Sequence, residues 1–320
     1  MSVAGYVAVV GEAVADALVE PVPADGCLAL RVRPGGGPAN TAVALSRLGT
    51  PTRFVGRLSR GVFGGLLLAY LERSGVDVSG CVRTAEQATL AIASVDDVGQ
   101  ASYDFYADHT ADWHWDAAEL AARYPHDAVC VHAGSLALVR DPGGPLIERM
   151  LRALRAQSTI SIDPNVRPNL VPASAYRAQL PAWTGLADVL RLSDEDLAHL
   201  LPGVTVEEAC ERWHADGVRL VVVTRGAAGA VASLDGQVVA VPAEPVALVD
   251  TVGAGDAFTG ALLHWLWRHG KLGSRLDGVR IDDVRHGLTF AARVAALTCA
   301  ASGADPPRAD ALAVGTGARG

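Results

Sequence analysis

The chain has 320 residues, of which 50% are hydrophobic and 19% are charged, a balance that supports a large buried core and excludes a disordered polypeptide. The net charge of −8 and the lack of a long basic run argue against a nucleic-acid-binding protein. No apolar run reaches membrane-spanning length, no signal peptide precedes the first apolar run, and the five cysteines form no C-x-x-C pair. These features predict a cytoplasmic protein with reduced, buried thiols and no membrane partner.

The first half of the chain consists of short apolar runs separated by glycine and proline. Because these residues end strands and helices, the runs between them define short elements. The interrupted stretch 12–34 is expected to supply strands of a separate small sheet. Further strands are predicted at 6–10 and 53–56, helices at 39–48 and 62–73, and a hairpin at 87–106 with its turn at 97–100.

From about residue 127, apolar strands alternate with helices. This order predicts a parallel sheet covered on both faces, with a ligand site beyond the carboxyl ends of the strands. Strands are predicted at 128–132, 159–163, 189–192, 220–224, 230–233 and 246–249, helices at 146–157, 194–200, 206–216, 257–269 and 281–298, and a flexible tail at 309–320.

The stretch 250–258 (Asp-Thr-Val-Gly-Ala-Gly-Asp-Ala-Phe) is the strongest site candidate. Gly253 and Gly255 lie in a turn that opens a helix, so successive backbone N–H groups and the helix dipole form an anion site suited to phosphate. Asp256 is either a partner of the helix dipole or a base beside the anion site, which phosphoryl transfer to a hydroxyl needs. The motif alone does not decide between these roles.

Motifs of several other enzyme classes are missing from the sequence. The glycine turn at 35–40 lacks the third glycine of G-x-G-x-x-G, which weakens the case for an NAD-dependent oxidoreductase. The sequence has no G-x-x-x-x-G-K-[ST], which excludes a P-loop NTPase. Neither G-x-S-x-G nor a His/Cys cluster with zinc spacing occurs.

Five segments in a fixed order carry a resemblance to a known family. They are 35–49 (beginning Gly-Gly-Gly-Pro-Ala-Asn), 163–167, 193–196, 223–229 and 250–258. With these motifs the chain resembles the ribokinase/PfkB family of small-molecule kinases over nearly its whole length. The resemblance implies a ribokinase-like three-layer α/β/α fold. It also implies one domain, 1–320, with a mostly parallel central sheet and a small β-sheet lid formed by about 12–34 and 86–110.

The resemblance implies a role for each matching residue around the transferred phosphate. Asp256 would take the proton from the acceptor hydroxyl, and the amides of Gly253, Ala254 and Gly255 would form the anion hole. The substrate would be held by Asp16 at the end of the first strand, Gly35, Gly36, Asn40, Tyr106 and Arg167. The open alternatives are a loop-stabilising turn for Asp16, a helix-start side chain for Asn40, hairpin packing for Tyr106 and a surface ion pair for Arg167.

On the nucleotide side, the resemblance implies ATP as phosphate donor and Mg²⁺ as the bridging ion. Asp196 would contact Mg²⁺ through water, because segment 193–196 has Ser and Asp where many relatives have Asn and Glu. An ordinary helix cap at Ser193 is the alternative. The carbonyls of Asp250 and Val252 would bind a monovalent cation such as K⁺. ATP itself would be lined by Asn165, Ser193, Thr224, Gly226, Gly229 and Gly255.

The resemblance is nearest to fructokinases and implies transfer to a primary hydroxyl of a furanose-like sugar. Phe105-Tyr106-Ala107 lacks the arginine that some keto-sugar-acid kinases carry here, which favours a neutral sugar. Ribose, a nucleoside and 2-keto-3-deoxygluconate are alternative acceptors. A non-catalytic sugar- or nucleotide-binding sensor is the alternative from another class, although a sensor has no need of Asp256 as a base. A homodimer formed through the lid is also expected from the resemblance.

Overall fold

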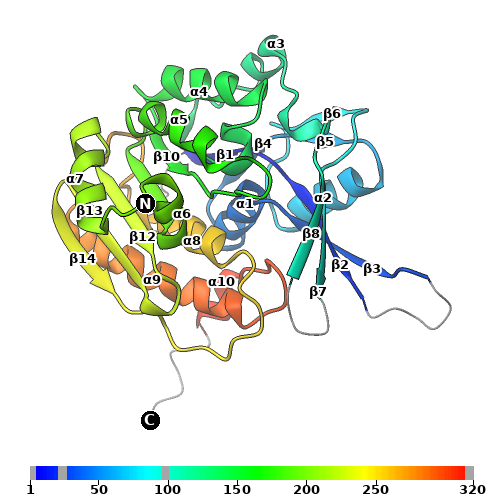
Figure 1. The fold of residues 1–320 in the computed structure, drawn as a ribbon. Helices are drawn as coiled ribbons and strands as arrows, with labels where there is room; N and C mark the ends of the chain where they lie inside the picture. The colour runs from blue at the N-terminus through cyan, green and yellow to red at the C-terminus, as the bar shows by residue number, and fades with distance from the viewer. Residues whose placement is uncertain (1–4, 21–26, 96–100, 314–320) are drawn as a thin grey trace.

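The computed structural model describes residues 5–20, 27–95 and 101–313. Helices cover both faces of a large sheet, and a smaller sheet projects from one side (Figure 1). The predicted three-layer α/β/α architecture with a mostly parallel central sheet is therefore confirmed. None of the helices in these ranges has the length and apolar composition that crossing a membrane requires.

The large sheet has eight strands in the order β14-β13-β12-β11-β10-β9-β1-β4. From β4 across to β12 all neighbouring strands are parallel, whereas β13 and β14 are added antiparallel at one edge. The parallel strands are almost wholly buried, which explains their continuous apolar runs. The bounds are Tyr6–Val10 (β1), Thr52–Val55 (β4), Ala128–Gly134 (β9), Thr159–Asp163 (β10), Val189–Ser193 (β11), Leu220–Thr224 (β12), Ala230–Leu234 (β13) and Gln237–Val241 (β14).

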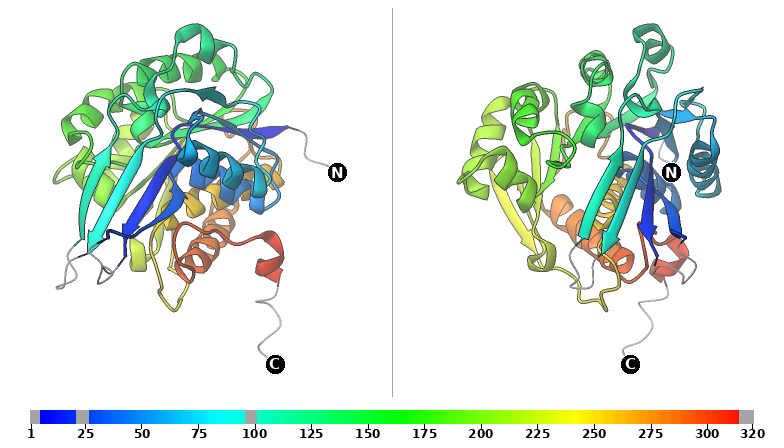
Figure 2. Two further views of the ribbon diagram at one scale, coloured as in Figure 1. Left: turned by 90° about the vertical axis from the view of Figure 1, so that its right-hand side faces the viewer. Right: turned by 45° about the vertical axis from the view of Figure 1, so that its right-hand side comes forward.

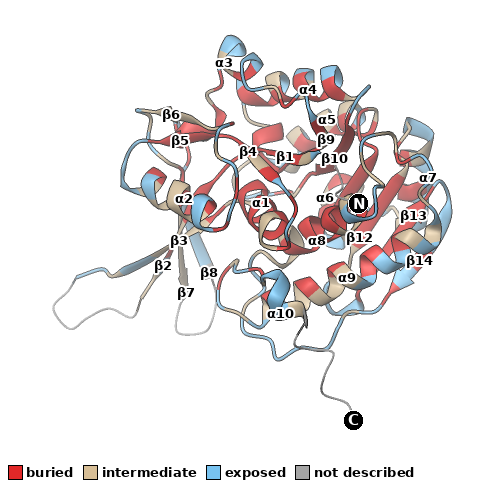
Figure 3. Cartoon of the chain, turned by 180° about the vertical axis from the view of Figure 1, so that it is seen from behind, coloured by how far each residue is buried: buried red, intermediate tan, exposed pale blue. Residues whose placement is uncertain are grey.

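The helices bury their apolar sides against this sheet. One core cluster joins α4 to α7 to the sheet, and a second joins α8 and α9 to its other face. Figure 3 shows the buried strands in red between helices whose outer surfaces are pale blue. The helices are α1 (Gly37–Arg47), α2 (Val62–Arg73), α3 (Ala117–Ala121), α4 (Gly143–Leu154), α5 (Ala173–Thr184), α6 (Asp194–Leu200), α7 (Val206–Asp216), α8 (Ala254–Arg268), α9 (Ile281–Cys299) and α10 (Ala309–Ala313).

The small sheet, called the lid below, has the strand order β3-β2-β7-β8 (Figure 2). Its register places Asp16 opposite Arg33 and Ala91, and Ala91 opposite Phe105. Because opposed residues share a face of a sheet, these side chains lie on one side of the lid. The strands are β2 (Val14–Val19), β3 (Leu30–Gly35), β7 (Leu90–Val95) and β8 (Ala101–Tyr106), and a separate pair joins β5 (Arg57–Ser59) to β6 (Val82–Thr84).

Most predicted elements are confirmed, but three expectations are wrong. Segment 246–249 is not a strand: it has no regular structure, and the prolines at 242 and 245 before it cannot donate ladder hydrogen bonds. The tail is helical at Ala309–Ala313. Of the cysteines, only Cys130 and Cys210 are buried; Cys27 is exposed, and Cys81 and Cys299 are partly so.

Several elements were not predicted, and some predictions cannot be compared. The sequence reasoning missed β5, β6, β14, α3 and α5, the last of which contains Pro181 in its interior. Residues 21–26 of the lid segment, the hairpin turn at 97–100 and the tail residues 314–320 lie outside the described ranges.

The two helices that begin at the main glycine motifs, α1 and α8, cross in close contact. A Cβ atom built on Gly260 of α8 would lie 2.8 Å from Cβ of Ala44 and 3.1 Å from the carbonyl oxygen of Thr41, both in α1. Only a residue without a side chain allows this approach, because the interior is packed to near crystal density. The crossing brings the first turns of the two helices together.

We expect Gly260→Ala to lower the free energy of unfolding by about 1–3 kcal/mol, because the added methyl group overlaps α1. Gly65→Ala is the matched control: Gly65 is also helical, but its Cβ would meet open space. Alanine is the better helix former, so the control should gain up to about 1 kcal/mol. Urea denaturation measures the free energy of unfolding of both variants. An equal increase in both would contradict the close contact between α1 and α8.

Candidate active site

The turn before α8 has the geometry of an anion site. Gly253 has a φ of 76°, a left-handed conformation that favours glycine, and the helix begins at Ala254. The Ala254 amide donates to the carbonyl oxygen of Thr251 at 3.3 Å. The amides of Gly253, Gly255 and Asp256 donate to no backbone oxygen in the described ranges, so they remain available to a ligand. We call residues 253–256 the anion turn.

The carboxyl group of Asp256 lies half-buried beside this turn. Its Oδ2 accepts a hydrogen bond of 2.8 Å from Nδ2 of Asn40, at the start of α1. Burial raises the pKa of Asp256 to about 6; the Asn40 hydrogen bond opposes this rise and the charge of Asp163 adds to it. Such a carboxyl is still mostly ionised at pH 7 and is a stronger base than an exposed aspartate.

A buried ion pair lies behind the anion turn. Nη1 of Arg191, on β11, is 2.8 Å from Oδ2 of Asp163, at the end of β10, and both side chains are less than a tenth exposed. Nη2 of Arg191 donates to Oγ1 of Thr224, at the end of β12, at 2.7 Å. A Cβ on Gly255 would lie within 3.0 Å of the guanidinium nitrogens. Arg191 therefore places positive charge against the anion turn.

Arg191 was not selected from the sequence, although a signal for it exists. It is the charged residue inside the otherwise apolar run 189–192, which leads directly into the polar segment 193–196. A charge in a buried strand is expected only when it is paired. Its partner, Asp163, belongs to one of the five motifs, but the sequence does not show that the two side chains meet.

Asp16 reaches the site from the lid. It lies within β2, so its predicted place at the end of the first strand is wrong: the chain leaves the large sheet at about residue 11 and Asp16 is already in the small sheet. Burial raises the pKa of Asp16 to about 6; the charge of Arg167 lowers it and that of Asp256 raises it. The carboxyl also lies over Gly35, where a side chain would overlap it.

Two further substrate predictions have different outcomes. Gly36 has a φ of 96°, and its Cβ would lie 2.9 Å from the carbonyl oxygen of Glu12, so the crossing from lid to α1 requires glycine.

Tyr106 is 60% exposed and lies on the opposite face of the lid from Asp16, whereas Phe105 shares the Asp16 face. The register therefore does not support Tyr106 as a substrate contact.

Arg167, the remaining charged candidate, is exposed at the rim of this site. Its charge lowers the pKa of both Asp16 and Asp256, so it lies near both carboxyls. No ion pair joins it to an acid in the part of the chain that the structure describes, which leaves the surface-pair alternative without support. Asn165 lies across the site with φ of 43° and donates to Oγ of Ser135 at 3.3 Å.

Ser193 and Asp196 form a reciprocal cap at the start of α6. Oδ2 of Asp196 accepts from the Ser193 amide at 2.9 Å and from its hydroxyl at 2.7 Å, and Oδ1 accepts from the Val166 amide at 2.8 Å. The capping alternative is therefore confirmed. Oδ1 retains one lone pair, which leaves it able to accept a hydrogen bond from a metal-bound water.

The predicted nucleotide residues Gly226 and Gly229 lie in the turn between β12 and β13. Gly229 has φ of 84°, and its Cβ would lie 2.7 Å from the Ala243 amide, so another segment of backbone packs directly on this turn. The turn follows Thr224, which Arg191 joins to the ion pair behind the anion turn. The structure therefore brings this segment to the same edge of the sheet as Asp256.

The segment before the anion turn has the features of a cation site. The Asp250 carboxylate accepts the amides of Val252 at 3.0 Å and Gly303 at 2.8 Å. Within the described ranges no backbone hydrogen bond ends on the carbonyl of Asp250 or Val252, whereas the Thr251 and Gly253 carbonyls do accept amides. No cluster of three or more His, Cys, Asp or Glu side chains suited to a metal occurs among the residues the structure describes.

The family model for pfkB family carbohydrate kinases matches residues 4–311. The chain therefore belongs to the pfkB family of carbohydrate kinases, and the resemblance drawn from the five motifs is confirmed. It is similar to a fructokinase of Rhizobium leguminosarum bv. trifolii, with 35% identity over 252 residues, 78% of this chain and 77% of that protein.

Solved structures agree with this membership. The crystal structure of a fructokinase with bound ATP from Xylella fastidiosa matches with a TM-score of 0.87 and 29% identity, covering 97% of each chain. A fructokinase double mutant from Vibrio cholerae O395, in its fructose, ADP and potassium ion bound form, matches with a TM-score of 0.78 and 26% identity over 94% of each chain. The protein is a sugar kinase, and the NAD-dependent alternative is not supported.

The raised pKa values predict a specific pH dependence. A base must be ionised to accept a proton, so kcat/KM should fall as the pH drops below about 6, the pKa of Asp256. Because the pKa of Asp16 is also about 6, the acid limb of log kcat/KM should approach a slope of about two. A pH–rate profile with the preferred sugar measures both features.

Asn40→Ala tests the assignment of this limb. Its amide stabilises the ionised form of Asp256, so its removal should raise the pKa of Asp256 and move the acid limb to higher pH. Arg31→Ala, at an exposed position of the lid, is the control and should leave the limb in place. A limb that stays in place in Asn40→Ala would show that Asp256 does not control it.

Proposed function

We propose that this sugar kinase transfers the γ-phosphate of ATP to a primary hydroxyl of D-fructose. The observation that carries the proposal is the position of Asp256: a carboxyl of raised pKa beside backbone amides with no backbone acceptor, within electrostatic reach of the lid residue Asp16. A base next to an oxyanion site is what phosphoryl transfer to an alcohol requires. The fructokinase relatives support the sugar, and the ATP-bound fructokinase structure supports the nucleotide.

In the proposed step, Asp256 accepts the proton of the sugar hydroxyl as its oxygen forms a bond to the γ-phosphorus. The bond from that phosphorus to the bridging oxygen of ADP breaks, and ADP leaves. The amides of Gly253, Gly255 and Asp256 stabilise the charge on the phosphoryl oxygens, and Arg191 adds positive charge behind them. Positioning and electrostatics supply most of the rate in such transfers.

The sugar would be held between the lid and α1. We assign its hydroxyl contacts to Asp16, Asn40 and Arg167, with Gly35 leaving room for the Asp16 carboxyl, Gly36 letting the chain cross from the lid to α1, and Phe105 in place of Tyr106 on the facing side. Two carboxyls close to the acceptor would repel an acidic substrate. This arrangement favours a neutral sugar over 2-keto-3-deoxygluconate, with ribose and nucleosides as the neutral alternatives.

ATP would lie along the carboxyl ends of β10 to β12, lined by Asn165, Ser193, Thr224, Gly226, Gly229 and Gly255. Mg²⁺ bound with ATP would neutralise phosphate charge, and the free lone pair on Asp196 Oδ1 fits a contact through water. The Asp250 and Val252 carbonyls, which no backbone amide occupies in the described ranges, fit a monovalent cation. The potassium ion in the Vibrio cholerae structure supports K⁺ as that cation.

ADP release from Mg-ATP, measured with D-fructose, D-ribose, 2-keto-3-deoxygluconate, adenosine and inosine in the presence of K⁺, tests the proposal. We expect turnover with fructose and a loss of about 10²–10⁴-fold in kcat for Asp256→Asn, which keeps the size of the side chain but removes the base. Asp282→Asn, an exposed acid in the first turn of α9, is the control. Turnover with another acceptor alone would replace fructose, and full activity in Asp256→Asn would remove the proposed base.

We also propose that the protein forms a homodimer through the lid. Leu18, Ala93 and Tyr103 form one row on the Asp16 face, where Leu18 is 48% and Tyr103 53% exposed. Apolar side chains on an uncovered sheet face are stabilised by a second copy. The protein should therefore have the mass of a dimer in light scattering.

A charge on the Asp16 face should separate the two copies. Tyr103→Asp is expected to shift the mass in light scattering to that of a monomer, because it buries a carboxylate in the interface. Tyr106→Asp, on the opposite lid face, is the matched control and should leave the dimer intact. Monomeric wild type, or a dimer that survives Tyr103→Asp, would place the interface elsewhere or exclude it.

A further inference from the structure

The segment that follows α9, residues 300–308, packs directly on the anion turn; we call it the support loop. The Gly303 amide donates to Oδ2 of Asp250 at 2.8 Å, just before that turn. Ala304 lies against Gly253, whose added Cβ would be 2.5 Å from the Ala304 Cβ. The amides of the anion turn therefore keep their direction only while the support loop keeps its place.

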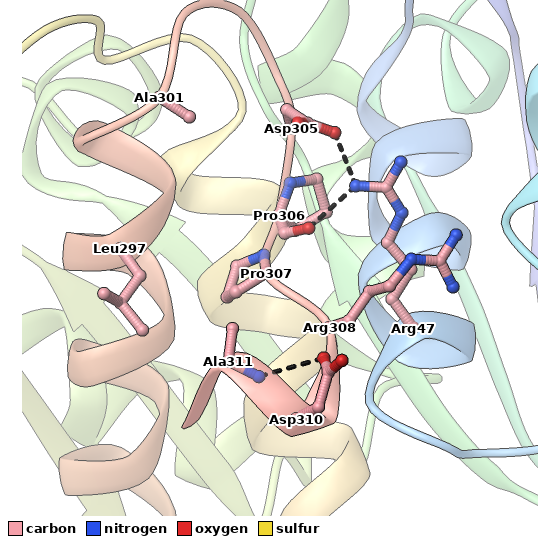
Figure 4. Close-up of a pocket in the computed structure, with 9 residues that line it drawn as sticks. All are labelled: Arg47, Leu297, Ala301, Asp305, Pro306, Pro307, Arg308, Asp310 and Ala311. Atoms are coloured by element: carbon pink, nitrogen blue, oxygen red, sulfur yellow. Dashed lines mark hydrogen bonds and ion pairs between the residues drawn. The ribbon is translucent and has the colours of Figure 1, made fainter. Parts of the chain in front are cut away.

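One side of the support loop is fastened to the large body of the protein. Arg47 of α1 forms an ion pair with Asp305 and donates to the carbonyl oxygen of Pro306 at 2.8 Å, as Figure 4 shows. The hydroxyl of Tyr70, on α2, donates to the carbonyl oxygen of Ala304 at 3.0 Å. These contacts hold the loop against α1 and α2, which do not belong to the lid.

The other side of the support loop contacts the lid. Nη1 of Arg33, on β3, donates to Oγ of Ser302 at 2.9 Å. The same guanidinium packs on Gly303, where a Cβ would lie 2.6 Å from Nη1 and where φ is 79°. In Figures 1 and 2 the orange-to-red segment after α9 lies beside the lid strands. The lid therefore contacts the support loop at Gly303, the residue whose amide donates a hydrogen bond to Asp250.

Arg33 is also the direct cross-strand neighbour of Asp16, the residue proposed to bind the sugar. In the antiparallel pairing of β2 and β3, Arg33 is opposite Asp16, so both side chains lie on the same face of the lid. A movement of β3 toward the support loop thus moves Asp16 as well. One strand pair links the sugar contact to the loop that supports the phosphate site.

We propose that Arg33 is a positioning residue that couples the sugar site on the lid to the anion turn through Ser302 and Gly303. The inference rests on the proposed function of Asp16 and the anion turn. Sugar bound to Asp16 holds β3 in place, Arg33 then holds the support loop, and the loop fixes the anion turn for the nucleotide. Sugar binding thereby strengthens nucleotide binding, and by linkage nucleotide binding strengthens sugar binding by the same factor.

Arg31 provides a matched control on the same strand. It lies two residues from Arg33, so its side chain points to the same face of the lid. Its guanidinium pairs with Glu20, within the lid, at 2.6 Å. Arg31→Ala removes an equal charge and a similar side chain from β3 without touching the support loop.

The coupling is measured by calorimetric titration of fructose with and without ADP and Mg²⁺. In wild type, fructose should bind more tightly when ADP is present, and Arg33→Ala should reduce this ratio of dissociation constants about tenfold or bring it to one. Arg33→Lys should restore part of the ratio, and Arg31→Ala should leave it unchanged. Ser302→Ala should have the effect of Arg33→Ala, and the double variant should add nothing further.

Amide hydrogen exchange of the support loop without any ligand tests the inference independently of the sugar. Arg33→Ala should speed exchange in 300–306 about tenfold, because the loop loses its lid contact, whereas Arg31→Ala should not. If wild type binds no fructose, the proposed function fails while this comparison still decides the contact. Unchanged exchange in Arg33→Ala, or fructose and ADP that bind independently in wild type, would overturn the coupling role.

Discussion

The close crossing of α1 and α8 at Gly260 is the contact on which the geometry of the proposed active site depends. It places the first turn of α1, with Asn40, against the first turn of α8, with Asp256, residues that are separated by more than two hundred positions in the chain. Because a helix is rigid over a few turns, a displacement at Gly260 is passed on to the 2.8 Å hydrogen bond between Asn40 and Asp256. Asp256, the proposed base, is thus oriented by helix packing rather than by its own turn.

Charge is concentrated where the parallel strands end. Asp163 and Arg191 form a buried pair there, and burying such a pair is costly unless its remaining hydrogen bonds are satisfied. Thr224 and Thr259 supply bonds to the two partners, although Nε of Arg191 has no partner among the described residues. The pair lies beside the anion turn, where a negatively charged ligand would interact with the guanidinium of Arg191.

The proposed site joins three separate parts of the molecule. The large sheet and its helices carry the anion turn and Arg191, the lid carries Asp16, and the support loop lies between them. Each part alone has an ordinary structural explanation, such as a helix start, a sheet face or a chain end. Their combination brings carboxyls of raised pKa next to amides without backbone acceptors, and it places a lid arginine on the loop that supports those amides.

The sequence by itself determined the layer architecture, because continuous apolar strands alternating with helices can be buried only in a covered parallel sheet. It also indicated a phosphate-binding turn at 253–256 with Asp256 as a candidate base, since glycine spacing and a helix start are local features. Only the tertiary structure decided which strand carries Asp16, which face Phe105 and Tyr106 occupy, that Arg191 lies behind the anion turn, and that Arg33 contacts the support loop. Those facts depend on strand register and on contacts between distant segments, which a local pattern of residues does not contain.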